Sequence, residues 1–378
     1  MSDIKFLPYY PKYIYLDGML QKGIPGKLRI FLDFKNCLQM IYSEEGANQL
    51  VNNSRRWRYI DPSIFSDFLE FVSFHKNYAK KRGVDLEIYT FMESGESLYH
   101  SQIDKGYKGS RRKATVCGLD EAATDLYFKI LNKNYDLTIR IGNKLPNVKV
   151  IRLNFLEADF MPYYLMNTLF EDSHEWTNVI YSTDKDMYQC LLEPNIFQYV
   201  RTWRSGKVLS RDDVMEHFLK KPNDLHPLEF PLALAIIGDD GDDVPGIKNV
   251  GPARLIAAFD EIRGIFGPMK DIYSKLKDGE DLFDDSIRTN NKYVQNILDA
   301  ERNEKRITKN LKLVSYYMIN DYFENAPNTE VRKKLKRVEE TILRPDTVLK
   351  TGTVLLDALN KIGISLPLSD ETIYTLFE

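Results

Sequence analysis

The first half of the chain alternates between short apolar runs and longer amphipathic segments. Runs of four to seven residues rich in Ile, Val, Tyr and Phe predict β-strands, and they lie at 28–32, 86–92, 148–153 and 179–182. Apolar residues at helical spacing separate them, and these segments lie at 62–82, 119–132 and 158–170. Strands that alternate with helices indicate an α/β domain with a largely parallel central sheet flanked by helices.

Beyond about residue 210 the pattern changes to helices and turns. An apolar helix is predicted at 230–237, a Gly- and Asp-rich turn follows it, and a further helix begins near Arg254. The first twenty-odd residues are rich in Tyr and Pro and predict an irregular extension. We therefore expect an N-terminal extension (1–27), an α/β core (28–210), a helical region (211–320) and a C-terminal helical segment without an assigned role (321–378).

Acidic residues follow the ends of the predicted strands. They are Asp33, Glu93, the pair Glu157 and Asp159, and the pair Asp184 and Asp186. In open α/β sheets, ligands bind at the carboxyl ends of the strands. Carboxylates that are distant in sequence should therefore converge on one edge of the sheet.

A further acidic pair lies in the turn GDDGDD. Asp239 and Asp242 are three residues apart, a spacing that puts both on one face of a helical turn. Taken singly, each acid has a plainer interpretation as a helix N-cap or turn residue, and GDDGDD alone could be an ordinary turn or a calcium loop. It lacks the glutamate spacing of an EF-hand. The order of three acidic clusters, each at the end of a predicted element, favours a metal site.

The residue types indicate which metal such a site would hold. Mg²⁺ prefers oxygen ligands and keeps several waters, and a pair of ions that hydrolyses a phosphodiester needs many carboxylates. The chain has only five histidines, and Cys37, Cys117 and Cys190 are scattered without zinc spacing, so they are read as reduced thiols. We expect two ions of Mg²⁺ or Mn²⁺ rather than Zn²⁺.

Basic and aromatic residues alternate between 99 and 113. Basic side chains follow phosphates, and aromatic rings stack on unpaired bases. The stretch contains Tyr99, Lys105, Tyr107, Lys108, Arg111, Arg112 and Lys113. Such a stretch can also be a solvated loop or helix face, but near an acidic cluster it favours a gateway over the site. A second basic run at 332–337 is either a solvated helix face or an extra duplex contact, and the sequence does not decide between them.

Composition restricts the class of protein. No apolar run approaches the roughly 18–20 residues that cross a bilayer, and the N-terminus lacks a signal pattern, so we expect a cytoplasmic protein without membrane contact. The net charge of −3 does not favour phosphate binding. It becomes compatible with nucleic acid if the acids cluster around metal while basic patches persist elsewhere.

Five segments follow one another along the chain: FLDFKNCL, GYKGSRR, LEADF, STDKDMYQCL and IIGDDGDDVPGIKNVGPARLIAAF. In residues and in order they resemble the motifs of the flap endonuclease or 5′-nuclease family, especially its bacterial and phage branch. The last resembles the helix-three-turn-helix and is the most specific. The resemblance spans roughly residues 28–260.

The resemblance implies a PIN-like 5′-nuclease core with a helical arch or gateway at about 94–125 and a helix-three-turn-helix DNA-binding region. It implies a 5′-3′ exonuclease or flap endonuclease that acts by two-metal hydrolysis on DNA flaps, nicked duplex or RNA primers during replication or repair. The implied partners are DNA with a 5′ end, an RNA–DNA hybrid and replication proteins. The protein would act as a monomer, with K⁺ at the helix-three-turn-helix.

The resemblance also assigns roles to residues. Asp33, Glu157 and Asp159 would hold the first metal. Asp184, Asp186 and Asp242 would hold or orient the second, with Asp239 nearby and Glu93 as a further ligand. Lys108 and Arg111 would contact the scissile phosphate, so the catalytic set is Lys108, Arg111, Asp33 and Asp184. The nucleic-acid contacts would be Tyr99, His100, Lys105, Tyr107, Lys108, Arg111, Arg112, Gly246, Lys248, Gly251 and Arg254.

Three positions depart from the family pattern. Glu93 replaces an aspartate, Phe160 replaces the second aspartate of the E-A-D-D motif, and His100 aligns with an arginine. These departures suggest an alternative, a structure-specific DNA-binding protein with weakened or lost catalysis, although the remaining acids speak against it. A third interpretation is an RNA-directed nuclease, and the helix-three-turn-helix favours DNA or a hybrid instead.

Overall fold

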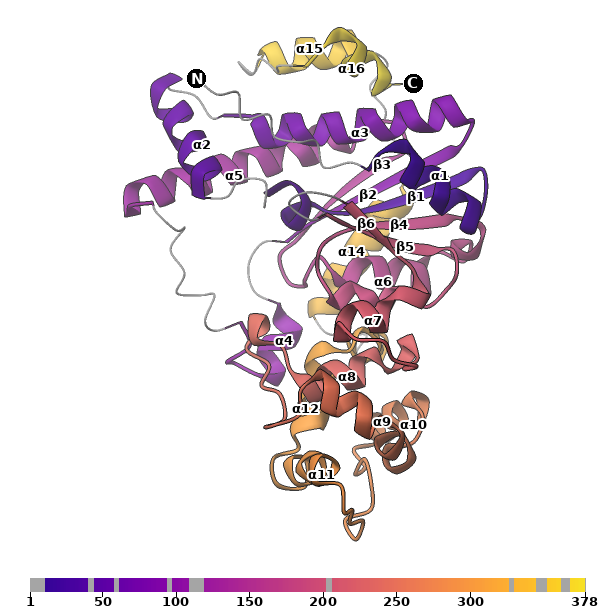
Figure 1. Cartoon of the computed structure of the whole chain (residues 1–378). Coiled ribbons are helices and arrows are strands. Elements are labelled where there is room, and N and C mark those ends of the chain that lie inside the picture. The colour runs from indigo at the N-terminus through magenta and orange to yellow at the C-terminus, as the bar shows by residue number, and fades with distance from the viewer. Residues whose placement is uncertain are drawn as a thin grey trace.

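A six-stranded sheet forms the centre of the upper half of the molecule (Figure 1). The computed structural model describes residues 11–39, 44–57, 61–93, 97–108, 119–201, 206–325, 330–344, 352–361 and 368–377. The strands are β1 (Lys27–Asp33), β2 (Asp85–Glu93), β3 (Val148–Leu153), β4 (Thr177–Tyr181), β5 (Ile196–Arg201) and β6 (Gly206–Leu209). Their order is β3-β2-β1-β4-β5-β6, and all neighbours are parallel except β5 and β6.

Both faces of the sheet are covered. Since alternate residues of each strand point to opposite sides, each strand contributes to two separate cores. Ile30 and Leu32 of β1 face a core formed with the helices above the sheet in Figure 1, whereas Phe31 faces the lower core. The upper helices are α1 (Tyr13–Lys22), α2 (Glu44–Trp57), α3 (Ser63–Arg82), α5 (Glu121–Gly142), α15 (Gly352–Lys361) and α16 (Asp370–Thr375). Helices α3 and α5 pack against each other, and α16 packs on α3.

The lower half of the molecule is helical and continues the core of the lower sheet face (Figure 1). Its helices are α4 (Leu98–Ile103), α6 (Phe160–Tyr164), α7 (Val214–Leu219), α8 (Phe230–Ile237), α9 (Pro252–Phe266), α10 (Met269–Asp278), α11 (Lys292–Glu304), α12 (Arg306–Val314), α13 (Tyr316–Asn325) and α14 (Glu330–Leu343). Helix α8 packs against α12. Helix α14 returns to the sheet, where the Arg344 carbonyl accepts a hydrogen bond of 2.7 Å from Lys149 Nζ.

The predicted fold class is confirmed, and each of the four predicted strands is present. Two strands, β5 and β6, were missed, and the helix predicted at 119–132 continues to Gly142. The helix predicted at 158–170 is shorter, because α6 passes into a π-helical turn at Leu165–Leu169. The irregular N-terminal extension was wrong for residues 13–22. Helix α1 forms there because Leu16, Met19 and Leu20 share one buried face.

The described helices include none with the length and apolarity that a bilayer crossing requires. The basic run at 332–337 lies on α14, whose apolar face buries Val331, Leu335, Val338 and Ile342. Lys333, Lys336 and Arg337 are exposed. Arg332 is instead paired with Glu339 and bonded to the Tyr164 hydroxyl. Of the three cysteines, Cys37 and Cys190 are buried, and Cys117 lies outside the described residues.

A buried histidine lies between α3 and the sheet. His75 Nδ1 is 2.8 Å from the Phe71 carbonyl oxygen, and Nε2 is 2.7 Å from the Tyr181 hydroxyl. Because a carbonyl can only accept, Nδ1 carries the proton and Nε2 accepts from Tyr181. The ring is therefore neutral. Burial lowers the pKa of His75 from 6.5 to about 3.

This histidine should make the protein sensitive to acid. Between pH 6.5 and pH 3 the unfolded chain binds a proton that the folded chain excludes, so stability falls as the pH falls. Between pH 7 and pH 5 the loss is about 2 kcal/mol, from 1.36 kcal/mol per pKa unit. Urea unfolding in EDTA at both pH values should show a loss about 2 kcal/mol larger for the unmodified protein than for His75→Gln. An equal loss in both proteins would contradict the assignment.

Candidate metal centre

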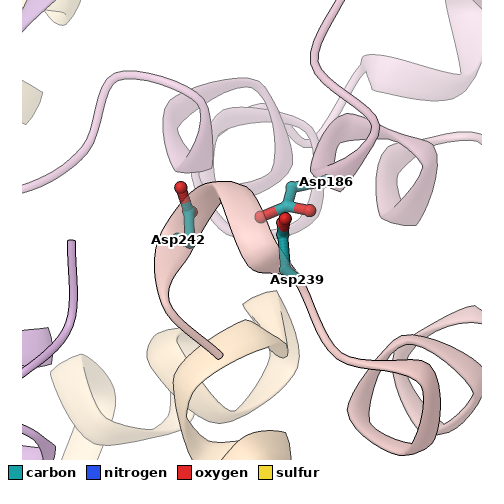
Figure 2. Close-up of side chains that lie close together, drawn as sticks. All are labelled: Asp186, Asp239 and Asp242. Carbon is teal, nitrogen blue, oxygen red and sulfur yellow. The ribbon is translucent and has the colours of Figure 1, made fainter. Parts of the chain in front are cut away.

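Three carboxylates meet below the sheet edge, where β4 ends. Oxygens of Asp186, Asp239 and Asp242 all lie within 4.8 Å of one another. Asp186 begins a 3₁₀ turn (Asp186–Cys190) after β4, and the other two belong to the turn that follows α8. Figure 2 shows the Asp186 carboxylate beside that of Asp239, with Asp242 further along the same turn. All three side chains are buried.

Two glycines allow the turn after α8 to bring its acids to this place. Asp239 and Val244 exchange backbone hydrogen bonds of 2.8 and 2.9 Å, which close the loop. The loop returns directly against the end of α8. A Cβ on Gly246 would lie 1.8 Å from the Ile237 carbonyl oxygen, and Gly238 has a φ of +85°. The close approach of two backbone segments therefore requires glycine at both positions.

Gly246→Ala should displace the turn and the acids that it carries. Overpacking against backbone typically costs about 1–3 kcal/mol, and we expect the upper end of that range together with weaker binding of Mn²⁺. Urea unfolding and calorimetric titration measure the two effects. Gly251→Ala is the matched control, since its Cβ would meet nothing within 4 Å. Similar effects of the two substitutions would show that the close contact does not position the acids.

A second group of acids lies at the ends of β1 and β4. Asp33 Oδ2 accepts a 3.0 Å hydrogen bond from Ser182 Oγ, and the same hydroxyl oxygen accepts the Asp184 backbone N–H at 3.1 Å. The backbone N–H of Asn36 donates to Asp33 Oδ1 at 3.1 Å. Burial raises the pKa of Asp33 to about 7, and repulsion by Asp184 and Glu93 adds to it. The neighbouring strands thus bring these acids together, as the sequence predicted.

Asp159 and Asp186 show that the acids are suited to a cation. Burial raises the pKa of both carboxyls well above the usual range, and neighbouring acids raise it further: Glu157 and Asp184 act on Asp159, and Asp184 and Asp242 act on Asp186. The Oδ1 atom of each is buried without a hydrogen-bond partner among the described residues. Ionised carboxylates that are buried, crowded and unpartnered are costly. A divalent ion with oxygen ligands would offset that cost.

Lysines partly neutralise the acids. Lys108 Nζ lies 2.6 Å from Glu157 Oε1 and 3.4 Å from Asp242 Oδ2. Burial alone would lower the pKa of Lys108, but the two acids raise it above its usual range. Lys185 Nζ lies 2.8 Å from Asp239 Oδ1, and Lys35 Nζ lies 2.5 Å from Glu93 Oε1. Burial raises the pKa of Glu93, but Lys35 reverses this, and the net shift is downward.

Lys35 and Lys185 were not among the residues predicted for the site. The available signal was their closeness in sequence to the site acids: Lys185 separates Asp184 from Asp186, and Lys35 comes two residues after Asp33. Their pairing depends on the turns that follow β1 and β4.

Near α4, at the start of the predicted gateway, the aromatic side chains are buried and hydrogen-bonded to other parts of the protein. The Tyr107 hydroxyl lies 2.9 Å from Asp242 Oδ2 and 3.2 Å from Glu157 Oε2. The Tyr107 ring stacks on His100, with centroids 4.3 Å apart. His100 Nε2 lies 2.9 Å from the Leu313 carbonyl oxygen, and the Tyr99 hydroxyl donates to the Lys312 carbonyl at 2.6 Å. Helix α4 is therefore attached to the end of α12.

These positions bear on the predicted nucleic-acid contacts. Tyr99, His100 and Tyr107 are buried, and burial lowers the pKa of His100, so its ring is neutral and already bonded. Their contact with nucleic acid stays a prediction that this geometry does not support. Lys105 is exposed. Arg111, Arg112 and Lys113 lie outside the described residues, as does much of the predicted arch at 94–125.

The predicted helix-three-turn-helix begins with the turn that carries Asp239 and Asp242 and continues to the start of α9. Gly246, Lys248 and Gly251 form the turn, and Arg254 donates to the Asn249 carbonyl at 2.7 Å while its guanidinium lies over the Tyr293 ring. A surface hollow of about 390 Å³ is lined by the first residues of α9 and by the end of α7. Its basic residues are Lys220, Lys221 and Arg254. The two lysines were not among the predicted contacts.

The chain is similar in sequence to curated bacterial proteins that are named 5′-3′ exonuclease. One, from Aquifex aeolicus (strain VF5), is 32% identical over 113 residues, which cover 30% of this chain and 36% of that protein. Another, from Buchnera aphidicola subsp. Schizaphis graminum (strain Sg), is 28% identical over 203 residues, 53% of this chain and 61% of that protein. The chain thus spans between about a third and three fifths of the curated relatives it matches. No protein-family model matches it.

Solved structures share the fold. The T5 5′-exonuclease with divalent metal ions (zinc) bound aligns with a TM-score of 0.57 and 20% identity, over 84% of this chain and 100% of the T5 protein. The bacteriophage T5 D15 flap endonuclease in complex with DNA and metal ions aligns with a TM-score of 0.57 and 19% identity, over 84% and 99%. The chain is thus similar in sequence to bacterial proteins named 5′-3′ exonuclease, and it shares the fold of the T5 5′-exonuclease.

Proposed function

We propose that the chain is a structure-specific, metal-dependent 5′ nuclease that hydrolyses phosphodiesters of DNA flaps, nicked duplex or RNA primers in replication or repair. The observation that carries the proposal is the meeting of acids from separate parts of the chain with Lys108 between two of them. Relatives named 5′-3′ exonuclease support it, as does the shared fold with T5 proteins whose structures hold metal ions and DNA.

The acids divide into two candidate ligand groups. We assign Asp33, Glu157 and Asp159 to one ion, with Glu93 beside them, and Asp184, Asp186, Asp239 and Asp242 to a second. Ligands that are all carboxylates favour Mg²⁺ or Mn²⁺ over zinc. Such ions, when bound, would lower the pKa of the attacking water and stabilise the attacking and leaving oxygens.

The chain's own residues would bind and orient the substrate around these ions. Lys108 would supply a positive charge to the scissile phosphate, and Tyr107 holds Glu157 and Asp242 in place by its hydroxyl. Further along the loop that carries Asp239 and Asp242, the turn from Gly246 to Gly251 would offer backbone N–H groups to a duplex phosphate, since helix N-termini bind anions. Lys248 and Arg254 would add charge there. A K⁺ ion at this turn belongs to the same proposal.

The test is cleavage of a 5′-labelled flap duplex by the full chain in Mg²⁺, in Mn²⁺ and in EDTA. We expect cleavage near the junction of single and double strand, only with metal. Asp184→Ala should abolish it while duplex binding remains. A matched RNA flap separates a DNA nuclease from an RNA-directed one. Tight duplex binding without cleavage in either metal would contradict the proposal and favour a DNA-binding protein.

A further inference from the structure

Tyr316, a residue outside all the predicted sites, reaches the buried side of the acidic cluster from the start of α13. Its side chain is 3% exposed. Its backbone N–H donates to Gln189 Oε1 at 2.9 Å. Gln189 in turn donates to the carbonyl oxygens of Asp186, at 3.2 Å, and Val314, at 2.8 Å. Gln189 therefore links the start of α13 by hydrogen bonds to the turn that begins with Asp186.

The ring of Tyr316 packs on the residue next to another site acid. Its centroid lies 5.7 Å from that of Phe160, edge to face, and Phe160 directly follows Asp159. Phe160 is the residue that stands where the family resemblance implies a second aspartate. Tyr316 is thus held between the neighbours of Asp159 and of Asp186.

The Tyr316 hydroxyl is buried without a hydrogen-bond partner among the described residues, as are Oδ1 of Asp159 and Oδ1 of Asp186. Other buried tyrosines of this chain are paired: Tyr181 with His75, and Tyr273 with Ser315. An unpaired buried polar group costs about 1–3 kcal/mol. One donor and two acceptors are thus buried without partners among groups whose charges act on one another, and a polar occupant would satisfy them.

The charges around Tyr316 agree with this geometry. Burial raises the pKa of the Tyr316 hydroxyl well above its usual value, and the charges of Asp159, Asp186 and Asp184 raise it further, in that order. The hydroxyl consequently keeps its proton and acts as a donor. A hydrated divalent ion offers water oxygens to such a donor and positive charge to the carboxylates.

We propose that Tyr316 is a positioning residue of the metal centre, whose hydroxyl donates a hydrogen bond into the hydration shell of the divalent ion beside Asp159 and Asp186. The helical region thereby supplies a polar group beside Phe160, the residue that follows Asp159. The inference rests on the metal binding that the proposed function requires, but it does not depend on cleavage.

Removal of the hydroxyl alone tests the inference. Calorimetric titration of the metal-free protein with Mn²⁺, without DNA, should show affinity about 10-fold lower for Tyr316→Phe, the lower end of the range for residues behind metal ligands. In EDTA the free energy of unfolding should either change by less than about 0.5 kcal/mol or rise, because the substitution removes an unpaired polar group. Tyr163→Phe is the matched control, since Tyr163 packs on Tyr316 in the same aromatic cluster. It should bind Mn²⁺ like the unmodified protein.

Cleavage adds a second readout. Tyr316→Phe should need about 10-fold more Mg²⁺ for half-maximal cleavage, with a normal rate at saturating metal. Equal Mn²⁺ affinity of Tyr316→Phe and the unmodified protein would overturn the inference, as would an equal loss in Tyr163→Phe. An unmodified protein that binds Mn²⁺ but cleaves nothing would sink the nuclease proposal and leave the role of Tyr316 intact. An unmodified protein that binds no Mn²⁺ would overturn both.

Discussion

Asp186→Asn is expected to make the metal-free protein more stable while nearly abolishing cleavage. Asp186 is buried beside Asp239 and Asp242, and its ionised form repels them. Asparagine has nearly the same shape without the charge. In EDTA at neutral pH we expect the free energy of unfolding to rise by about 1 kcal/mol or more, within the usual range of single-site effects. Cleavage should fall at least about 10³-fold, the upper range for loss of one group that stabilises transition-state charge.

Metal should reverse the order of stability. Only the unmodified protein gains the full binding energy, about 2.7 kcal/mol when the metal concentration is 100 times the dissociation constant. Acid should remove the advantage of asparagine in EDTA. Because the pKa of Asp186 is raised in the folded protein, its destabilising effect shrinks as the pH falls below that folded-state pKa and is lost once the pH is below the ordinary pKa of the unfolded carboxyl.

Urea unfolding with EDTA and with Mn²⁺ measures both effects. Asp240→Asn is the matched control, since it removes the same charge from an exposed position in the same turn. It should change stability by no more than about 0.5 kcal/mol. If Asp186→Asn lowers the stability in EDTA, or if the two substitutions have equal effects, then repulsion among the clustered carboxylates does not destabilise the metal-free protein.

Lys108→Met should slow cleavage by about 10²–10³-fold, the scale observed when one charge-stabilising donor is removed, and weaken duplex binding far less. Methionine keeps the length of the side chain without its charge. The same substitution should strengthen Mn²⁺ binding in the absence of DNA. The Lys108 ammonium, 2.6 Å from Glu157 and 3.4 Å from Asp242, competes with a cation for these carboxylates.

Single-turnover cleavage, duplex binding and Mn²⁺ titration separate these effects. Lys105→Met is the control, because Lys105 is exposed three residues away. It should reduce duplex binding slightly and leave metal affinity unchanged. An equal loss of binding and cleavage in Lys108→Met would make Lys108 a simple phosphate anchor. Unchanged Mn²⁺ affinity would show that the ammonium does not compete with the ion.

The sheet and the meeting of the acids could be predicted because both follow from short-range pattern. Each apolar run identifies a strand, and the rule that parallel strands end at one edge places Asp33 near Asp184 without further information. Helix α1 was also readable from Leu16, Met19 and Leu20. The Tyr- and Pro-rich composition around them led to the wrong prediction.

The groups that support the acids could not be predicted in this way. Gln198 of β5 donates to the carbonyl oxygens of Ser182 and Asp184, and it does so only because β5 lies beside β4. Tyr316 reaches the site through the packing of α13 on α6. No periodicity or spacing links either residue to an aspartate more than ten positions away. Such contacts depend on the assembled tertiary structure.

The division of the acidic cluster between β4 and the turn after α8 sets an order of events during biosynthesis. Proteins leave the ribosome N-terminus first. A nascent chain that ends before Asp239 already carries Asp33 and Asp184 but lacks two of the three clustered carboxylates. The centre is complete only when the turn after α8 has emerged and docked, and Tyr316 follows later still. Synthesis of the strands therefore precedes completion of the cluster formed by Asp186, Asp239 and Asp242.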